Sequence, residues 1–155
     1  MASPVKDALN AISLNRIPAQ IELYEQLIQA AEPLFELEGK KLGEVIAHHA
    51  QELMLYDVML QECKTIEDTV RVKLEEIEST LYRRLNETNQ RALGTRDLQQ
   101  YIKSEPQYVS AYEILLEVVH VKRKLEAIVE ALKSLGWSLN NITKLRIAQL
   151  EHVTL

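Results

Sequence analysis

Residues 53–81 read LMLYDVMLQECKTIEDTVRVKLEEIESTL, and this stretch decides the fold. Its apolar side chains recur at alternating spacings of three and four residues, which is the pattern of a coiled-coil seam. The seam positions are Leu53, Tyr56, Leu60, Cys63, Glu67, Val70, Leu74, Ile77 and Leu81. Glu67 is the only charged residue among them. The stretch therefore predicts a long helix that packs lengthwise against another helix.

The surrounding stop signals extend this helix in both directions. No proline occurs between residues 40 and 93, and Gly43 is the only glycine there, so we expect one helix over 40–93. Gly39 marks the break before it. Upstream, Ser3-Pro4 and Pro18 each open a shorter helix. We therefore divide the chain into an N-terminal helical extension, 1–38, and a main helical domain, 39–155.

The second half of the chain predicts three more helices. Thr95 can cap a short helix over 95–104, and Pro106 opens a long one over 106–135. Gly136 is well placed to end that helix, with Trp137 as the apolar contact after it, and a last helix follows over 138–153. The fold class is therefore all-α, with long helices and coiled-coil-like seams.

The apolar surface of the last two helices is too wide for one buried face. The seam of 106–135 is flanked by further apolar residues, so this helix should bury one face inside the protomer and another between protomers. The sequence thus predicts a closed homo-oligomer. The residues expected to hold it together are Trp137, Leu139, Ile142, Leu145 and Leu150.

Composition and motifs point away from secretion and catalysis. The lone Cys63 excludes a disulfide framework, and no run of about 18 apolar residues or signal-peptide pattern occurs, so we expect a cytoplasmic protein without a membrane partner. Glu117 and His120 have the Glu-x-x-His spacing of di-iron bundles, but the required second copy is missing. No phosphate loop, nucleophile elbow or paired zinc-ligand spacing is present. We expect no enzyme, no metal and no cofactor.

Charge is distributed unevenly along a chain whose net charge is −5. Residues 1–69 hold 5 basic and 12 acidic side chains, a net of −7, whereas residues 70–155 hold 13 basic and 11 acidic, a net of +2. Between residues 83 and 103 the net charge is +3. Single-strand binding without sequence preference needs a line of positive charge and flat rings. Candidates are Arg83, Arg84, Arg91 and Arg96 for charge, and Tyr82 and Tyr101 for rings.

Two alternatives to this site stay open. The arginines could instead form ion pairs at helical spacing with Glu78, Glu87 and Asp97. Lys122-Arg123-Lys124 is a second basic cluster, and it is the next candidate if the first does not bind DNA.

Several strings resemble the UvsY-type recombination mediators of tailed phages. They are MLY at 54–56, LxxRL at 81–85, KSE at 103–105 and ALKSxGW at 131–137, followed by Ile142 and Arg146. Their order and spacing match over roughly residues 54–150, and residues 1–40 have no counterpart. The family's DNA-binding motif is Leu-basic-x-Arg-Leu, which falls on residues 81–85. Arg84 matches it directly, whereas Tyr82 replaces the basic residue and Arg83 can restore the charge.

The resemblance implies a small helical protein that forms a homo-oligomeric ring, with a heptamer as the expected size. It implies a mediator that binds single-stranded DNA and helps to load a RecA-like recombinase onto strands coated with single-strand-binding protein. For a phage-encoded chain, the compartment would be the host cytoplasm. The acidic net charge departs from what DNA binding favours. The rival class is a non-enzymatic coiled-coil structural or adaptor protein that binds only other proteins.

Overall fold

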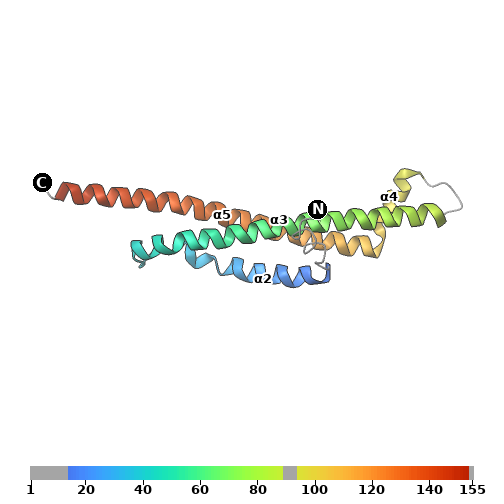
Figure 1. Ribbon diagram of the computed structural model, residues 1–155, viewed down its shortest axis with the longest axis horizontal. Coiled ribbons are helices and arrows are strands. Elements are labelled where there is room, and N and C mark those ends of the chain that lie inside the picture. The colour runs from blue at the N-terminus through green and yellow to red at the C-terminus, as the bar shows by residue number, and fades with distance from the viewer. Residues whose placement is uncertain (1–13, 89–93, 154–155) are drawn as a thin grey trace, which may run out of the picture.

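The computed structural model describes residues 14–88 and 94–153, and this part of the chain is all-α, as predicted (Figure 1). After a single 3-10 turn, Leu14–Arg16, come α2 (Ile17–Gln29), a second 3-10 turn (Glu32–Leu34), α3 (Leu42–Thr88), α4 (Thr95–Ser104) and α5 (Pro106–Val153). The helix expected over 40–93 is confirmed as α3 as far as residue 88, and α4 has the predicted bounds. The helix expected near residues 3–14 and the last residues of 40–93 lie outside the described residues.

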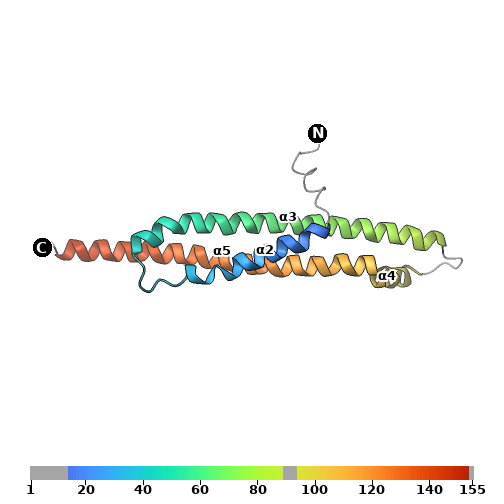
Figure 2. The same ribbon diagram turned by 90° about the horizontal axis from the view of Figure 1, so that it is seen from below.

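The long helices α3 and α5 run antiparallel and pack side by side along the middle of the molecule (Figures 1 and 2). The seam predicted on α3 faces α5, and Cys63 and Val70 on α3 and Val118 and Leu125 on α5 are almost completely buried. The Cys63 thiol lies 3.6 Å from the carbonyl oxygen of Val118. Burial raises the pKa of this thiol to about 11, so Cys63 is a packed core residue.

The charged seam residue Glu67 has its partners inside the bundle. Its side chain is only 10% exposed, and its two oxygens each accept a charged hydrogen bond: Oε2 from Lys122 Nζ on α5 at 2.6 Å, and Oε1 from Arg71 Nη2 at 2.6 Å. The hydrogen bond from Lys122 is the main reason why the pKa of Glu67 is lowered. A charge can occupy a seam position here because α5 supplies the opposite charge at the same level.

One prediction about helix ends is wrong. We expected Gly136 to end a helix and Ser138 to start another, but α5 continues from Pro106 to Val153. The reason is packing against α3. A Cβ built at position 136 would lie 2.7 Å from Cε1 of His49, and Nε2 of His49 is 2.7 Å from the carbonyl oxygen of Leu132. Gly136 therefore allows α3 and α5 to approach closely at this point, and it does not end the helix.

A substitution at this contact should reverse the usual effect of replacing a helical glycine. Gly to Ala inside a helix normally stabilises by roughly 0.5–1 kcal/mol. We expect Gly136→Ala to destabilise instead, because the new methyl group must displace the His49 ring from its hydrogen bond. In a His49→Ala background the same change should be stabilising. Urea unfolding of the four variants in this double-mutant cycle measures the sign, and a stabilising Gly136→Ala in the wild-type background would contradict the expectation.

Helix α2 belongs to the same core as α3 and α5. Ile17, Ile21 and Tyr24 are buried in it, and the Tyr56 hydroxyl on α3 donates to the carbonyl oxygen of Leu27 at 2.7 Å. Residues on both sides of the boundary predicted at residue 38 therefore share one core. An amphipathic helix buries its apolar side in whichever groove the tertiary fold provides, and here that groove lies between α3 and α5.

The hairpin has two unequal ends (Figure 2). At one end α3 runs past the start of α5, and α4 packs there against both long helices. At the other end α5 continues well beyond the start of α3, so its last turns have no other described helix beside them. We call these the loop end and the tail end. The predicted DNA-binding and oligomerisation residues lie at opposite ends.

Candidate nucleic-acid interface

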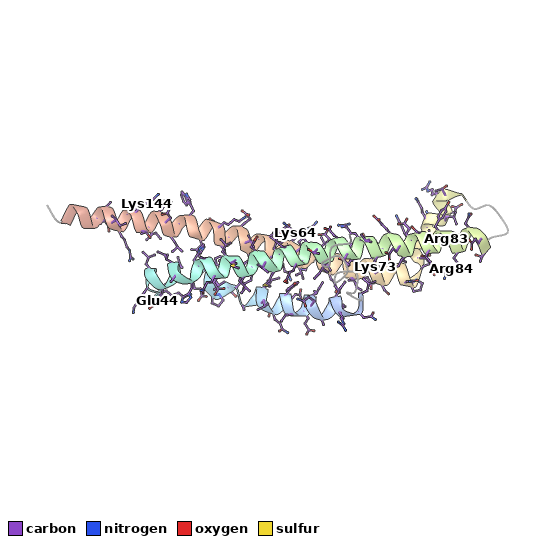
Figure 3. All side chains as sticks on the ribbon, viewed as in Figure 1. Glu44, Lys64, Lys73, Arg83, Arg84 and Lys144 are labelled. Carbon is purple, nitrogen blue, oxygen red and sulfur yellow. The ribbon has the colours of Figure 1, made fainter. Side chains whose placement is uncertain are left out.

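The predicted DNA-binding residues gather at the loop end. Tyr82, Arg83 and Arg84 occupy the last turns of α3 and are exposed, and Figure 3 shows the two arginines beside α4. Arg96 is exposed in the first turn of α4. Arg91 lies outside the described residues. The described charges are therefore exposed on two separate helices, α3 and α4, that pack against each other.

Buried leucine and isoleucine side chains fix the orientation of this surface. Leu81 is 2% exposed and anchors the end of α3 in the bundle, while the three residues after it are exposed. On α4, Leu98 and Ile102 are 4% and 1% exposed. These two residues are four positions apart and share one face of α4, which is the buried one, whereas residues 99–101 are exposed. The apolar residues of the loop end thus hold its basic and aromatic residues toward water.

Ion pairing at the loop end differs from what the sequence predicted. Within the described residues, Arg83 and Arg96 form no ion pair, and none of the expected pairs with Glu78, Glu87 or Asp97 is present. Arg84 does have a partner, since its Nη2 lies 3.1 Å from Oε2 of Glu105. This pair joins α3 to the junction between α4 and α5. Arg83 and Arg96 are therefore available to phosphates, whereas Arg84 must first leave a carboxylate.

Sequence reasoning missed the role of Glu105. Its position 21 residues after Arg84 is not a helical spacing, so no periodicity could link the two. The only signal was that both lie in strings quoted for the family resemblance, LxxRL and KSE. The contact exists because α4 packs against the end of α3 and against α5, which sets Glu105 beside Arg84.

Aromatic rings are exposed at the same end. Tyr82 is 43% exposed and Tyr101, on α4, is 55% exposed. A third ring, Tyr112 on α5, is 44% exposed and stacks on Tyr108 with 6.2 Å between ring centroids. The sequence analysis did not single out this pair, although its i, i+4 spacing was a usable signal. Exposed tyrosines near unpaired arginines can stack on the bases of a single strand without reading its sequence.

The second basic cluster has a structural role. Lys122 bonds to Glu67, and Nζ of Lys124 lies 3.2 Å from Oε1 of Glu25 on α2. Both lysines therefore tie helices of the bundle together. Arg123 is the only exposed residue of the three. This cluster is a poor alternative DNA site.

The predicted oligomerisation residues differ widely in exposure. Trp137 is 70% exposed and Leu145 is 65% exposed, while Ile142 is half-buried. Leu139 is only 3% exposed and lies against α3 of its own chain beside His49, so its predicted role in contacting another copy is wrong. The sequence could not show that α3 covers this position. The side chain of Leu150 lies outside the described residues.

Neither a metal centre nor a membrane span is found in the described part of the chain. No group of three or more His, Cys, Asp or Glu side chains there is arranged to hold a metal ion, and Glu117 and His120 are both exposed. No helix in that part is sufficiently long and apolar to cross a bilayer.

Comparisons with protein-family models, with curated proteins and with solved structures find no match to this chain.

Proposed function

We propose that this protein is a UvsY-type recombination mediator that performs no chemistry. It binds single-stranded DNA at the loop end and helps to load a RecA-like recombinase onto strands coated with single-strand-binding protein. It acts as a homo-oligomeric ring, with a heptamer as the expected size, in the cytoplasm of the cell that a phage infects. The resemblance over residues 54–150 supports the family assignment.

The observation that carries the proposal is the arrangement of the loop end. Arg83 on α3 and Arg96 on α4 are both exposed, neither is neutralised by a described carboxylate, and the exposed rings of Tyr82 and Tyr101 lie on the same two helices. A purely structural role for these arginines would predict ion pairs within the bundle. Lys122 and Lys124 show what such structural cations look like in this fold. The difference between the two groups favours a ligand with negative charge and flat bases.

The net negative charge of the first 69 residues suggests that DNA and the protein partners bind to different parts of the chain. Carboxylates of α2 and of the first half of α3 repel a phosphate backbone, so we place the contacts with the recombinase and the single-strand-binding protein there. A ring would repeat the loop-end arginines around its axis, which raises avidity for one strand. The overall charge of −5 then matters less than the local charge at the loop end.

A binding assay and a native mass on one preparation test this function. At low salt, we expect the protein to be retained on immobilised single-stranded DNA of mixed sequence and released as salt rises, because phosphate contacts depend on counterion release. The native mass should be a multiple of 17.8 kDa. An assembly that is not retained at any salt concentration would contradict the mediator and favour the adaptor protein.

A further inference from the structure

The chain contains one tryptophan, and it lies almost entirely in solvent. Trp137 is 70% exposed on α5, directly after Gly136, which meets His49 in the first turns of α3. Tryptophan is usually well buried in folded proteins, and it is enriched among the residues that dominate binding energy at interfaces. An indole presented to water on a rigid helix is therefore suited to insert into another surface.

A cavity of suitable size lies at the start of α3. Its volume is about 440 Å³, within the range of about 300–1,000 Å³ that holds small ligands. Leu34, Val45, Leu132 and Leu135 form its apolar walls, and Glu44, Glu52, Lys40 and His48 bring polar groups to it. We call it the Val45 cavity. Apolar walls with charged groups at the edge are what an anchored indole requires, since the ring is apolar and its N–H needs an acceptor.

Trp137 cannot fill the Val45 cavity of its own chain. Three consecutive residues of α5 lie in three different surroundings. Leu135 lines the cavity, Gly136 meets His49 of α3, and Trp137 is exposed to solvent. Side chains two positions apart on an α-helix point about 160° apart. Trp137 and the Val45 cavity are thus on opposite flanks of α5 and at the same level. When the anchor of one copy enters the cavity of the next, the two copies form a head-to-tail contact. Such contacts generate a closed ring if the rotation from one copy to the next is a whole fraction of a full turn.

Charges beside the anchor and the cavity are complementary in the same arrangement. Because α3 and α5 are antiparallel and meet at His49 and Gly136, Glu52 on α3 lies level with Lys133 on α5. Lys133 is one turn from Trp137, and Glu52 lines the Val45 cavity. Residues 131–150 contain three basic side chains and no acidic one. Lys133 pairs with Glu130 on its own helix at 2.9 Å, but both side chains are exposed, so a neighbouring copy at the same height would offer Glu52 as a second partner.

We propose that Trp137 of each copy inserts into the Val45 cavity of the next copy, with the two bundles at the same height. The ring then closes about an axis parallel to the helices. This inference rests on the ring assembly in the proposed function and adds its contact. It also leaves every loop end on one side of the ring, where a single strand can contact several copies.

Two complementary variants test the contact. Trp137→Ala removes the anchor and keeps the cavity, while Val45→Trp fills the cavity and keeps the anchor. We expect the wild type to contain more than two copies, each variant alone to be monomeric with unchanged helical circular dichroism, and their mixture to form a one-to-one dimer. Trp137→Ala that keeps the wild-type mass, or a mixture of folded variants that stays monomeric, would overturn the proposal.

A charge exchange tests the register without altering the cavity walls. Lys133→Glu or Glu52→Lys alone should raise the protein concentration below which the ring dissociates. The double variant should return this concentration to the wild-type value. The fluorescence of the only tryptophan reports the same event, since its emission should shift to longer wavelength as the wild type dissociates on dilution. Two single reversals that are not rescued by combination, or emission that stays constant through dissociation, would count against the contact.

The failure of this contact is distinguishable from the failure of the proposed function. A ring that dissociates with Trp137→Ala but never binds single-stranded DNA retains the contact and refutes the mediator. A ring that binds DNA and is unaffected by Trp137→Ala refutes the contact alone. A wild type that is monomeric at micromolar concentration refutes both.

Discussion

Replacing Arg83 and Arg84 together by alanine should weaken single-stranded DNA binding steeply without changing the oligomer. Each phosphate of a single strand that the protein no longer neutralises lowers the slope of log affinity against log salt by about 0.7. Removing two such arginines per engaged chain then removes roughly a sevenfold change in affinity between about 50 and 200 mM salt, and several chains of a ring multiply the effect. Salt titrations with a labelled oligonucleotide measure both slope and affinity.

The Arg84–Glu105 pair sharpens this prediction. Arg83 forms no ion pair with any described residue, whereas Arg84 is held 3.1 Å from Glu105, so Arg83→Ala should reduce affinity more than Arg84→Ala does. Glu105→Gln should raise affinity because it frees Arg84. If Arg84 served only to join α3 to the α4–α5 junction, Glu105→Gln would lower thermal stability and leave affinity unchanged.

A matched control removes two charges elsewhere. Lys64 on α3 and Arg123 on α5 are exposed and lie away from the loop end (Figure 3 labels Lys64). The double change Lys64→Ala/Arg123→Ala should leave the salt slope nearly as it is. Equal effects of the control and of Arg83→Ala/Arg84→Ala would mean that net charge, not the loop end, governs binding.

Tyr82→Ala should give a different signature from the arginine variants. Stacking on a base is worth about 1–3 kcal/mol and involves little charge, so affinity should fall while the salt slope stays nearly constant. Tyr82 is 43% exposed, so the fold should tolerate the change. An unchanged affinity for Tyr82→Ala would remove this ring from the site.

Replacing Glu67 by alanine should be among the most destabilising single changes in the chain. The substitution leaves the Lys122 ammonium, whose side chain is 21% exposed, without its carboxylate inside the α3–α5 seam. Removing one partner of a buried pair costs about 3–5 kcal/mol, and we expect the lower end because Arg71 is 53% exposed and can turn to water. Denaturant unfolding measures the loss. Glu76→Ala, which breaks an exposed pair with Lys73 on the same helix, is the control and should have little effect.

Acid should abolish the contribution of Glu67. The pKa of this carboxyl is lowered in the folded chain, chiefly by the hydrogen bond from Lys122, so its stabilising effect is present above the ordinary Glu pKa of about 4.3. It is lost as pH falls below that value and through the lower pKa of the folded state. Unfolding curves of wild type and Glu67→Gln should therefore differ near neutral pH and converge in acid. A constant difference across this range would show that Glu67 does not titrate in the fold.

A double variant separates the effect of the unpaired charge from the effect of packing at this position. Glu67→Leu/Lys122→Leu replaces the pair by apolar side chains, which in other proteins is often neutral or stabilising. We expect the double variant to regain most of the stability lost in Glu67→Ala. If it is as unstable as the single variant, packing at this level of the seam, and not the unpaired charge, explains the loss.

The sequence alone was sufficient for the all-α class, for α3 and for α4. The three–four spacing of seam residues such as Cys63 and Val70 is a property of one helix, and Pro106 acts on the backbone beside it. The cap predicted at Thr95 is wrong, because the N-cap of α4 is Gly94 and no side chain caps this helix. The sequence also singled out Tyr82, Arg83 and Arg84 by their charge and rings, and these side chains are exposed. Such inferences succeed because their physical causes lie within a few residues of each other.

Only the tertiary structure decided the features that join distant parts of the chain. Gly136 continues α5 because His49 packs on it, and Glu67 is tolerated in the seam because Lys122 lies at the same level. Arg84 is paired because the chain returns with Glu105 beside it. Each outcome depends on the register between two helices, and that register is set by the sum of all contacts along the bundle, so no local pattern of residues contains it.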